Sequence, residues 1–231
     1  MKSQQNTRWI YLSYPLDENT PAYGGMQGNF SVMSEKNMEQ GDSCNTSRWT
    51  LSNHIGTHLD FPRHFVRTGS TIDEYPIDFF VFNKIGFIDI SPVPKAHIIS
   101  WQDIESENLP YDIDILLVKT GFGEKRNDSI YWKENPGFFP ELAHNLRESF
   151  PQIRVLGFDL ISLSSLMHRE IGRKAHKCFL DHQRPILPLE DIDLSGVSGS
   201  FKFNQLIVAP WMVCKADAVP CTVIAEIFDE K

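Results

Sequence analysis

The residues best suited to chemistry lie in one short stretch, which reads NHIGTHLDFPRHF at positions 53–65. It holds three histidines and one aspartate within eleven positions: His54, His58, Asp60 and His64. One histidine is most often structural, and two could fall together by chance. Four ligand-type side chains in so short a stretch, in a chain with only eight histidines, predict a metal site.

The spacing within this stretch lets its side chains converge on one point. His58 and Asp60 are two positions apart, so they point the same way if the chain is extended. His54 lies four positions before His58, a separation that a helical turn or a tight loop closes. Gly56 allows the backbone to fold between them without Cβ strain. Two imidazoles and one carboxylate on a short platform suit zinc, or manganese and related divalent ions.

His64 stands apart from this set, because it follows Pro62, which stiffens the chain, and lies four residues after Asp60. A hydrolytic metal site needs an open position for water. We therefore expect His64 to carry protons rather than to act as a further ligand.

The segment HIGTHLDFPRH resembles the H-x-G-T-H-x-D-x-P-x-H motif of the cyclase, or bacterial kynurenine formamidase-like, family of metal-dependent hydrolases. Every fixed position of that motif is matched. Weaker similarities to family segments cover most of the chain: LSYPL at 12–16, PAYGG at 21–25, KTGF at 119–122, GFDLIS at 157–162 and ADAVPCTV at 216–223.

The resemblance implies a site with one or two divalent ions, Zn²⁺ in the first place and Mn²⁺ as the alternative. It implies a first metal held by the two leading motif histidines and the aspartate, which also bridges to a second metal held by a later histidine and glutamate. The implied ligands are His54, His58, Asp60, His176 and Glu190. The last motif histidine, His64, is implied as the general acid/base.

The chain departs from the family pattern around the second metal. The stretch between His176 and Glu190 is about two residues longer than in the pattern, and without an insertion Pro188 would take the place of the glutamate. His182, inside this stretch, is a competing ligand, and His176 could instead be packed on a helix face. Tyr14, Ala218 and Thr222 replace a histidine, a glycine and an arginine of the family segments.

Composition narrows the class of protein. The chain has 231 residues, of which 41% are hydrophobic and 23% are charged, so we expect a single domain over 1–231 with a sizeable core. A formal charge of −8 disfavours nucleic acid and anionic membranes as partners. The N-terminus lacks the apolar core of a signal peptide, and no run reaches the roughly 20 apolar residues of a membrane span, which predicts a cytoplasmic location. The four cysteines show no C-x-x-C spacing and are expected to be free, largely buried thiols.

Strand and helix patterns alternate through the second half, which predicts an α/β fold with a mixed sheet. The resemblance implies the swivelling β/β/α domain of the cyclase family, with helices flanking the sheet. We expect strands at 10–12, 29–33, 49–52, 84–90, 114–120, 153–160, 203–209 and 223–228, helices at 100–108, 141–150 and 172–180, and irregular or edge structure at 72–82.

These features favour a cytoplasmic enzyme with a small-molecule substrate. The leading hypothesis is metal-dependent hydrolysis of an amide-type C–N bond, with an N-formylkynurenine-like arylformamide of tryptophan catabolism as substrate. The resemblance further implies a homodimer or higher homo-oligomer. Two alternatives stay open: a metal-dependent lyase, dehydratase, cyclase or isatin-type lactam hydrolase acting on a small carbonyl compound, and a non-catalytic binder of metal or small molecules.

Overall fold

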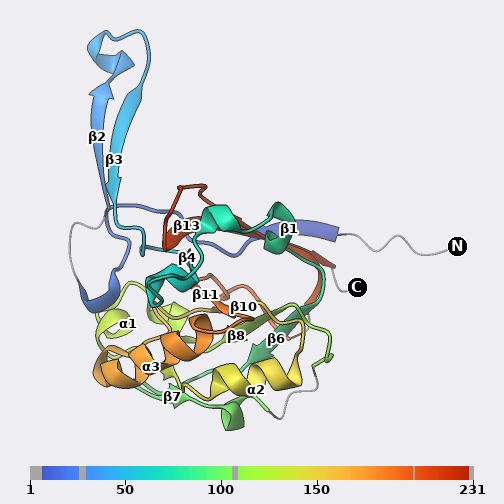
Figure 1. The fold of residues 1–231 in the computed structure, drawn as a ribbon. Coiled ribbons are helices and arrows are strands. Elements are labelled where there is room, and N and C mark those ends of the chain that lie inside the picture. Colours follow the sequence, from blue (N-terminus) through green and yellow to red (C-terminus); the bar gives the residue numbers. More distant parts are fainter. Residues whose placement is uncertain (1–6, 26–29, 106–108, 200, 229–231) are drawn as a thin grey trace, which may run out of the picture.

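The centre of the molecule is one mixed β-sheet with the strand order β5-β12-β13-β4-β11-β10-β8-β6 (Figure 1). The computed structural model describes residues 7–25, 30–105, 109–199 and 201–228. Strands β6, β8, β10 and β11 run parallel to their neighbours in this group. From β11 to the other edge, each pair of neighbours is antiparallel: β11 with β4, β4 with β13, β13 with β12 and β12 with β5. Strand β1 pairs with the C-terminal half of β13.

The chain forms thirteen named strands, three α-helices and several 3-10 turns within the described residues. The strands are β1 Thr7–Tyr11, β2 Phe30–Lys36, β3 Thr46–Leu51, β4 His58–Asp60, β5 Val81–Phe82, β6 Ile85–Asp89, β7 Ile98–Ile99, β8 Ile115–Lys119, β9 Gly137–Phe138, β10 Val155–Phe158, β11 Leu187–Glu190, β12 Lys202–Pro210 and β13 Ala218–Phe228. The α-helices are α1 Ile130–Lys133, α2 Leu142–Ser149 and α3 Arg169–Leu180. Short 3-10 turns include η1 Tyr23–Gly25, η3 Pro62–His64 and η6 Trp101–Asp103.

The core lies on both faces of the parallel strands. Strand β10 is buried along its whole length, as is β8 over Ile115–Val118, which explains their unbroken apolar sequences. Helices α2 and α3 cover one side of the sheet (Figure 1). On the α3 face turned to the core lie Gly172, Ala175, His176, Phe179 and Leu180. The sheet curls, because Phe87 of β6 and Phe203 of β12 approach with ring centroids 6.2 Å apart.

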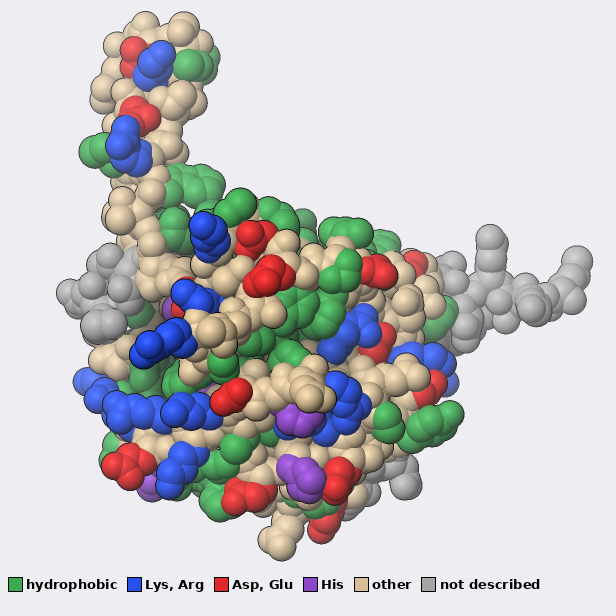
Figure 2. All heavy atoms as spheres, viewed as in Figure 1, with side chains coloured by type: hydrophobic (Ala, Val, Ile, Leu, Met, Phe, Trp, Pro, Cys, Tyr) green, Lys and Arg blue, Asp and Glu red, His purple; other side chains and the backbone are tan. Residues whose placement is uncertain are grey.

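A β-hairpin stands away from this body. Strands β2 and β3 pair only with each other among the described residues, and this hairpin, residues 30–51, is called the arm below. Figure 1 shows the arm projecting from the sheet, and Figure 2 shows hydrophobic side chains along it and on the body surface at its base. Val32, Met33 and Trp49 are 45%, 57% and 55% exposed.

The predicted strands and the helices at 141–150 and 172–180 are all found, with bounds shifted by a few residues. The helix predicted at 100–108 is wrong beyond its first turn. Ser100 and Asp103 do form a capping box, but only one 3-10 turn follows, because Ile104 leaves the helical conformation (φ −126°) and buries its side chain. Residues 106–108 lie outside the described residues.

The cysteines are free, but the expectation that they are largely buried is wrong. Cys44 lies on the arm, Cys178 on the solvent side of α3 and Cys214 in a loop, and all three are exposed; Cys221 alone of the four is buried. Among the described residues no helix is long and apolar enough to cross a membrane.

Candidate metal centre

The short strand β4 sets the position of the two central side chains. Its extended backbone turns His58 and Asp60 to one face, while Leu59 between them is fully buried on the other. β4 lies between β11 and β13, and the register places Glu190 directly opposite His58. A glutamate 132 positions later in the sequence is therefore brought to the motif by strand pairing alone.

The loop before β4 folds His54 back onto the strand. Gly56 makes this possible: it has φ +60°, and a Cβ at this position would lie 2.4 Å from a methyl carbon of Leu16. The Nδ1 atom of His54 lies 3.1 Å from Oδ1 of Asp60. The Gly56 carbonyl accepts a hydrogen bond of 2.8 Å from Nδ1 of His58.

Helix α3 and strand β11 supply the other side of the centre. Nε2 of His176 lies 3.6 Å from Oδ2 of Asp60 and 3.6 Å from Oε1 of Glu190. Helix α3 can approach this closely because Gly172 has no side chain: an added Cβ would lie 2.2 Å from Oγ of Ser164. The backbone amide of Leu163 donates to Oε1 of Glu190 at 2.7 Å and fixes that carboxylate.

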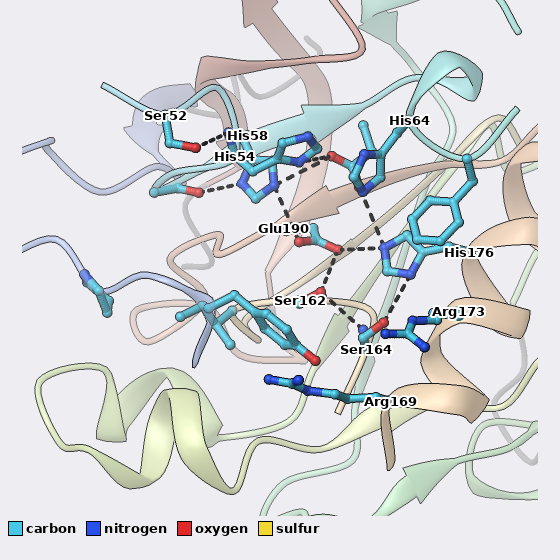
Figure 3. Close-up of a pocket in the computed structure, with 16 residues that line it drawn as sticks. Ser52, His54, His58, His64, Ser162, Ser164, Arg169, Arg173, His176 and Glu190 are labelled. Atoms are coloured by element: carbon cyan, nitrogen blue, oxygen red, sulfur yellow. Dashed lines mark hydrogen bonds and ion pairs between the residues drawn. The ribbon is translucent and has the colours of Figure 1, made fainter. Parts of the chain in front are cut away.

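The structure thus brings all six predicted site residues together: His54, His58, Asp60, His64, His176 and Glu190. Figure 3 labels the four histidines and Glu190 around this point. The two competing positions lie elsewhere. Pro188 pairs with Leu156 inside the sheet. His182 is exposed and accepts a hydrogen bond from the backbone amide of Arg184.

The donor atoms fit a divalent metal. The buried Nε2 of His58 and both carboxylate oxygens of Asp60 have no hydrogen-bond partner, an arrangement that is costly unless a cation satisfies them. Nδ1 of His58 and Nδ1 of His176 each face a backbone carbonyl, which can only accept, so in the neutral rings Nε2 carries the lone pair and faces the carboxylates. Histidines that bind metals typically donate their second nitrogen in this way. Ligand atoms within 4.8 Å of one another form two groups around Asp60, one with His54 and His64 and one with His58 and Glu190.

A second aspartate, which the sequence analysis did not single out, holds two of the histidines from outside. Oδ2 of Asp217 lies 3.2 Å from Nε2 of His54 and 3.2 Å from Nδ1 of His64. The side-chain amide of Asn53 donates to the other oxygen of Asp217 at 2.8 Å. The only signal in the sequence was its place in the ADAVP segment.

The charges around the centre favour different protonation states for different histidines. Burial opposes a charge on His54, but the nearby carboxylates of Asp217 and Asp60 outweigh it and raise its pKa to about 10. The same balance, with Asp60 and Glu190 as partners, raises the pKa of His176 to about 9. Burial lowers the pKa of His64, and although Asp60 opposes this, the neighbouring His54 and His176 lower it further. His64 is therefore the ring of this cluster most inclined to be neutral and able to accept a proton.

Behind Glu190 lies a buried ion pair that sequence reasoning also missed. Asp191 has φ +53° and accepts two hydrogen bonds from Arg126, at 2.9 Å from Nε and 2.7 Å from Nη2. The Tyr131 hydroxyl donates to the same carboxylate, and Thr57 donates to the Asp191 carbonyl at 2.6 Å. Because Thr57 precedes His58 and Asp191 follows Glu190, this network braces both sides of the centre.

The centre opens into a cavity of about 440 Å³, a size suited to a small molecule. Phe65 forms one wall and stacks on His176, with centroids 4.6 Å apart and ring planes at 17°. Tyr23 of η1 lines the cavity, as do Arg169 and Arg173 of α3. Figure 3 shows the two arginines on the side of the pocket opposite His54 and His58.

Comparison with known proteins gives one family match and several full-length likenesses. Residues 10–165 match the model of the family described as "Putative cyclase". The chain is 28% identical over 219 residues to a kynurenine formamidase of Bacillus cereus, covering 94% of this chain and 96% of that enzyme. It resembles the structure of isatin hydrolase A from Labrenzia aggregata, with a TM-score of 0.79, 23% identity and coverage of 96% and 94%. It also resembles a predicted metal-dependent hydrolase from Bacillus stearothermophilus, with a TM-score of 0.77, 22% identity and coverage of 96% and 98%.

Proposed function

This chain belongs to the cyclase family, and we propose that it is a metal-dependent hydrolase that cleaves an amide-type C–N bond in a small molecule. An arylformamide, of the N-formylkynurenine type, is the proposed substrate class. The kynurenine formamidase relatives support this class because they match over nearly their whole length. Water adds OH to the formyl carbon and H to the nitrogen, the C–N bond breaks, and formate and an arylamine leave.

One observation carries the proposal: Nε2 of His58 and both carboxylate oxygens of Asp60 are buried with no hydrogen-bond partner among the described residues. His54, His176 and Glu190 converge on the same point. His54, His58 and Asp60 would hold a first divalent ion, and His176 and Glu190, with Asp60, would hold a second. Zn²⁺ is the proposed ion, with Mn²⁺ as the alternative, since the set mixes imidazole and carboxylate. When bound, such an ion polarises a carbonyl and makes water acidic enough to attack it near neutral pH.

His64 is proposed to move the proton. A carboxylate only accepts, so the contact with Asp217 places the proton of neutral His64 on Nδ1 and leaves the lone pair on Nε2. That nitrogen faces the centre, 3.9 Å from Oδ2 of Asp60. Nε2 can accept a proton from water on that side and return it to the departing nitrogen. Asp217 keeps the ring in this orientation.

The test combines metal analysis with a substrate panel. Purified wild type, His58→Ala and His64→Ala are assayed for bound metal and for turnover of a formanilide, a lactam and an ester, with formate measured directly. We expect His58→Ala to lose metal and activity, and His64→Ala to lose activity while keeping metal. Metal loss in His64→Ala but not in His58→Ala would reverse the two roles, and turnover of the lactam alone would replace the formamidase assignment.

We further propose that two copies of the chain assemble through the arm. A two-stranded hairpin is marginal by itself in water, and this one exposes Val32, Met33 and Trp49. At its base the Trp49 ring stacks on Trp211, with centroids 6.2 Å apart, beside the largely exposed Tyr11. In a two-fold dimer each arm would cover the apolar surface at the base of the other, which suits a self-complementary interface. The cytoplasmic location stays a prediction from the sequence.

A further inference from the structure

Two arginines share one wall of the candidate active-site cavity. Arg169 is the first residue of α3 and Arg173 follows one turn later, so both project from the same face of the helix. Both line the cavity that also contains His58 and Asp60, and Figure 3 shows their guanidinium groups extending into it. The helix brings His176 to the metal cluster three residues after Arg173. One rigid element therefore positions both the arginines and a proposed metal ligand.

Both arginines are exposed while they line the cavity, so a ligand bound there can reach them. Within the described part of the chain neither Arg169 nor Arg173 forms an ion pair with a carboxylate. Like charges four residues apart on a helix repel, and the first turn of a helix carries the positive end of its dipole. An anion bound between them would relieve both effects.

The Tyr23 hydroxyl completes this wall. The Arg169 guanidinium is close enough to act on this hydroxyl and partly offsets the rise in its pKa, so the two groups are neighbours in the cavity. Burial raises the pKa of Tyr23 above its usual value, so the hydroxyl stays protonated at neutral pH. The two guanidinium groups present donors only, and the protonated hydroxyl can donate as well. A carboxylate presents acceptors only, in the planar form that a guanidinium matches with two hydrogen bonds.

We propose that Arg169, Arg173 and Tyr23 bind a carboxylate of the substrate, so that this enzyme selects anionic aryl amides over neutral ones. This inference rests on the proposed hydrolase function. The carboxylate lies on the α3 wall, the scissile C–N bond lies at the metal cluster, and the aromatic ring between them packs against the apolar side chains of Phe65 and Ile161.

The experiment compares formanilide with its three ring-carboxylated isomers, 2-, 3- and 4-formamidobenzoate, which differ only in the charge and in its distance from the amide. In wild type we expect at least one isomer to exceed formanilide in kcat/KM by ~10- to ~100-fold, the range of a charge-assisted hydrogen-bond pair, chiefly through a lower KM. Arg169→Gln and Arg173→Gln should lower kcat/KM far more for the carboxylated isomer than for formanilide, and so remove most of this preference. Arg173→Lys should keep part of the preference for the carboxylated isomer, because lysine retains the positive charge but cannot form the two parallel hydrogen bonds of a guanidinium.

Lys174→Gln is the matched control, since it removes a positive charge from the same helix at an exposed position that does not line the cavity. Bound metal is measured in every variant and should not change. Equal kcat/KM for charged and neutral substrates in wild type would overturn the inference. So would a loss of preference in Lys174→Gln as large as in Arg173→Gln, or equal losses on both substrates in the arginine variants.

A failure of the proposed hydrolase function can be distinguished from a failure of this inference. If no formanilide is hydrolysed, the reaction assignment fails, and calorimetric binding of the same four compounds to the metal-loaded protein decides the inference by itself. Tighter binding of a carboxylated isomer that Arg173→Gln abolishes supports it. Equal or absent binding of all four overturns it.

Discussion

Asp191→Asn should damage both the stability and the metal site of this protein, although the Asp191 side chain contacts no proposed ligand. The side chain is 1% exposed and pairs with Arg126, whose side chain is 12% exposed. Asparagine has the same shape and tolerates the left-handed backbone at φ +53°, so the substitution removes the charge without forcing the turn to change. It leaves the Arg126 guanidinium buried and uncompensated.

The loss of stability depends on which interactions with Arg126 and Tyr131 an asparagine can keep. Removing one partner of a buried ion pair costs about 3–5 kcal/mol. The amide oxygen of asparagine can still accept from Nε of Arg126 or from Tyr131, but not in the two-point arrangement, so we expect a loss near the lower limit, about 3 kcal/mol. For a chain of this size that corresponds to a fall in Tm of roughly 6–12 °C. Because Asp191 directly follows Glu190, the displaced turn should also weaken metal binding by about 10-fold.

Thermal unfolding with and without chelator measures the first effect, and titration of the metal-free protein with Zn²⁺ measures the second. Asp112→Asn is the control, since its carboxylate forms an exposed pair with Lys84 at 3.3 Å and should change stability by no more than about 1 kcal/mol. An Asp191→Asn protein as stable as this control would refute the view that the buried pair braces the centre. A lower Tm with unchanged metal affinity would confine its role to stability.

Three further predictions use other parts of the molecule. Removal of the proposed metals by a chelator should lower Tm, because a ligand present at 100 times its Kd stabilises the folded state by about 2.7 kcal/mol; an unchanged Tm in calorimetry would contradict bound metal. Replacing residues 32–49 of the arm by an Asn-Gly turn between the paired Ser31 and Thr50 should convert the proposed dimer to a monomer in light scattering, with metal content per chain preserved. An unchanged mass would show that the arm is not the interface. Asp103→Asn should destabilise the protein by about 1 kcal/mol at neutral pH through loss of the Ser100 capping box. Burial opposes the charge on Asp103, but hydrogen bonds from Ser100 and His97 outweigh it and lower its pKa below the ordinary 3.8, so the carboxylate stabilises the fold above that value. The difference from wild type should vanish as the pH of the unfolding experiment falls through the lowered pKa.

The sequence predicted those parts of the site that depend on local geometry. His58 and Asp60 share a face because an extended chain alternates, and His54 reaches them because Gly56 permits the turn. Both relations are readable from spacing. Glu190 was predicted as a site residue only from the family resemblance. No local pattern indicates that β11 pairs with β4 and places this glutamate opposite His58.

Contacts between distant residues were beyond the reach of local patterns. Asp217 lies 163 positions from His54, and Arg126 lies 65 positions from Asp191, so neither pairing leaves a periodic signal. The arm shows the same limit at the level of fold. Strands at 29–33 and 49–52 were predicted from the sequence. Whether they pair with the central sheet or only with each other depends on tertiary contacts, which a local pattern does not show. The helix expected from Ser100 failed because burial of Ile104 overrode a sound start signal.

The most direct test of the central claim is a metal titration of the chelated, metal-free protein with formate release as the readout. We expect no turnover of a formanilide without metal, a rise with added Zn²⁺ or Mn²⁺ that saturates at one or two equivalents per chain, and no rise in His58→Ala. Full activity in the metal-free protein, or saturation of His58→Ala at the same stoichiometry as wild type, would contradict it.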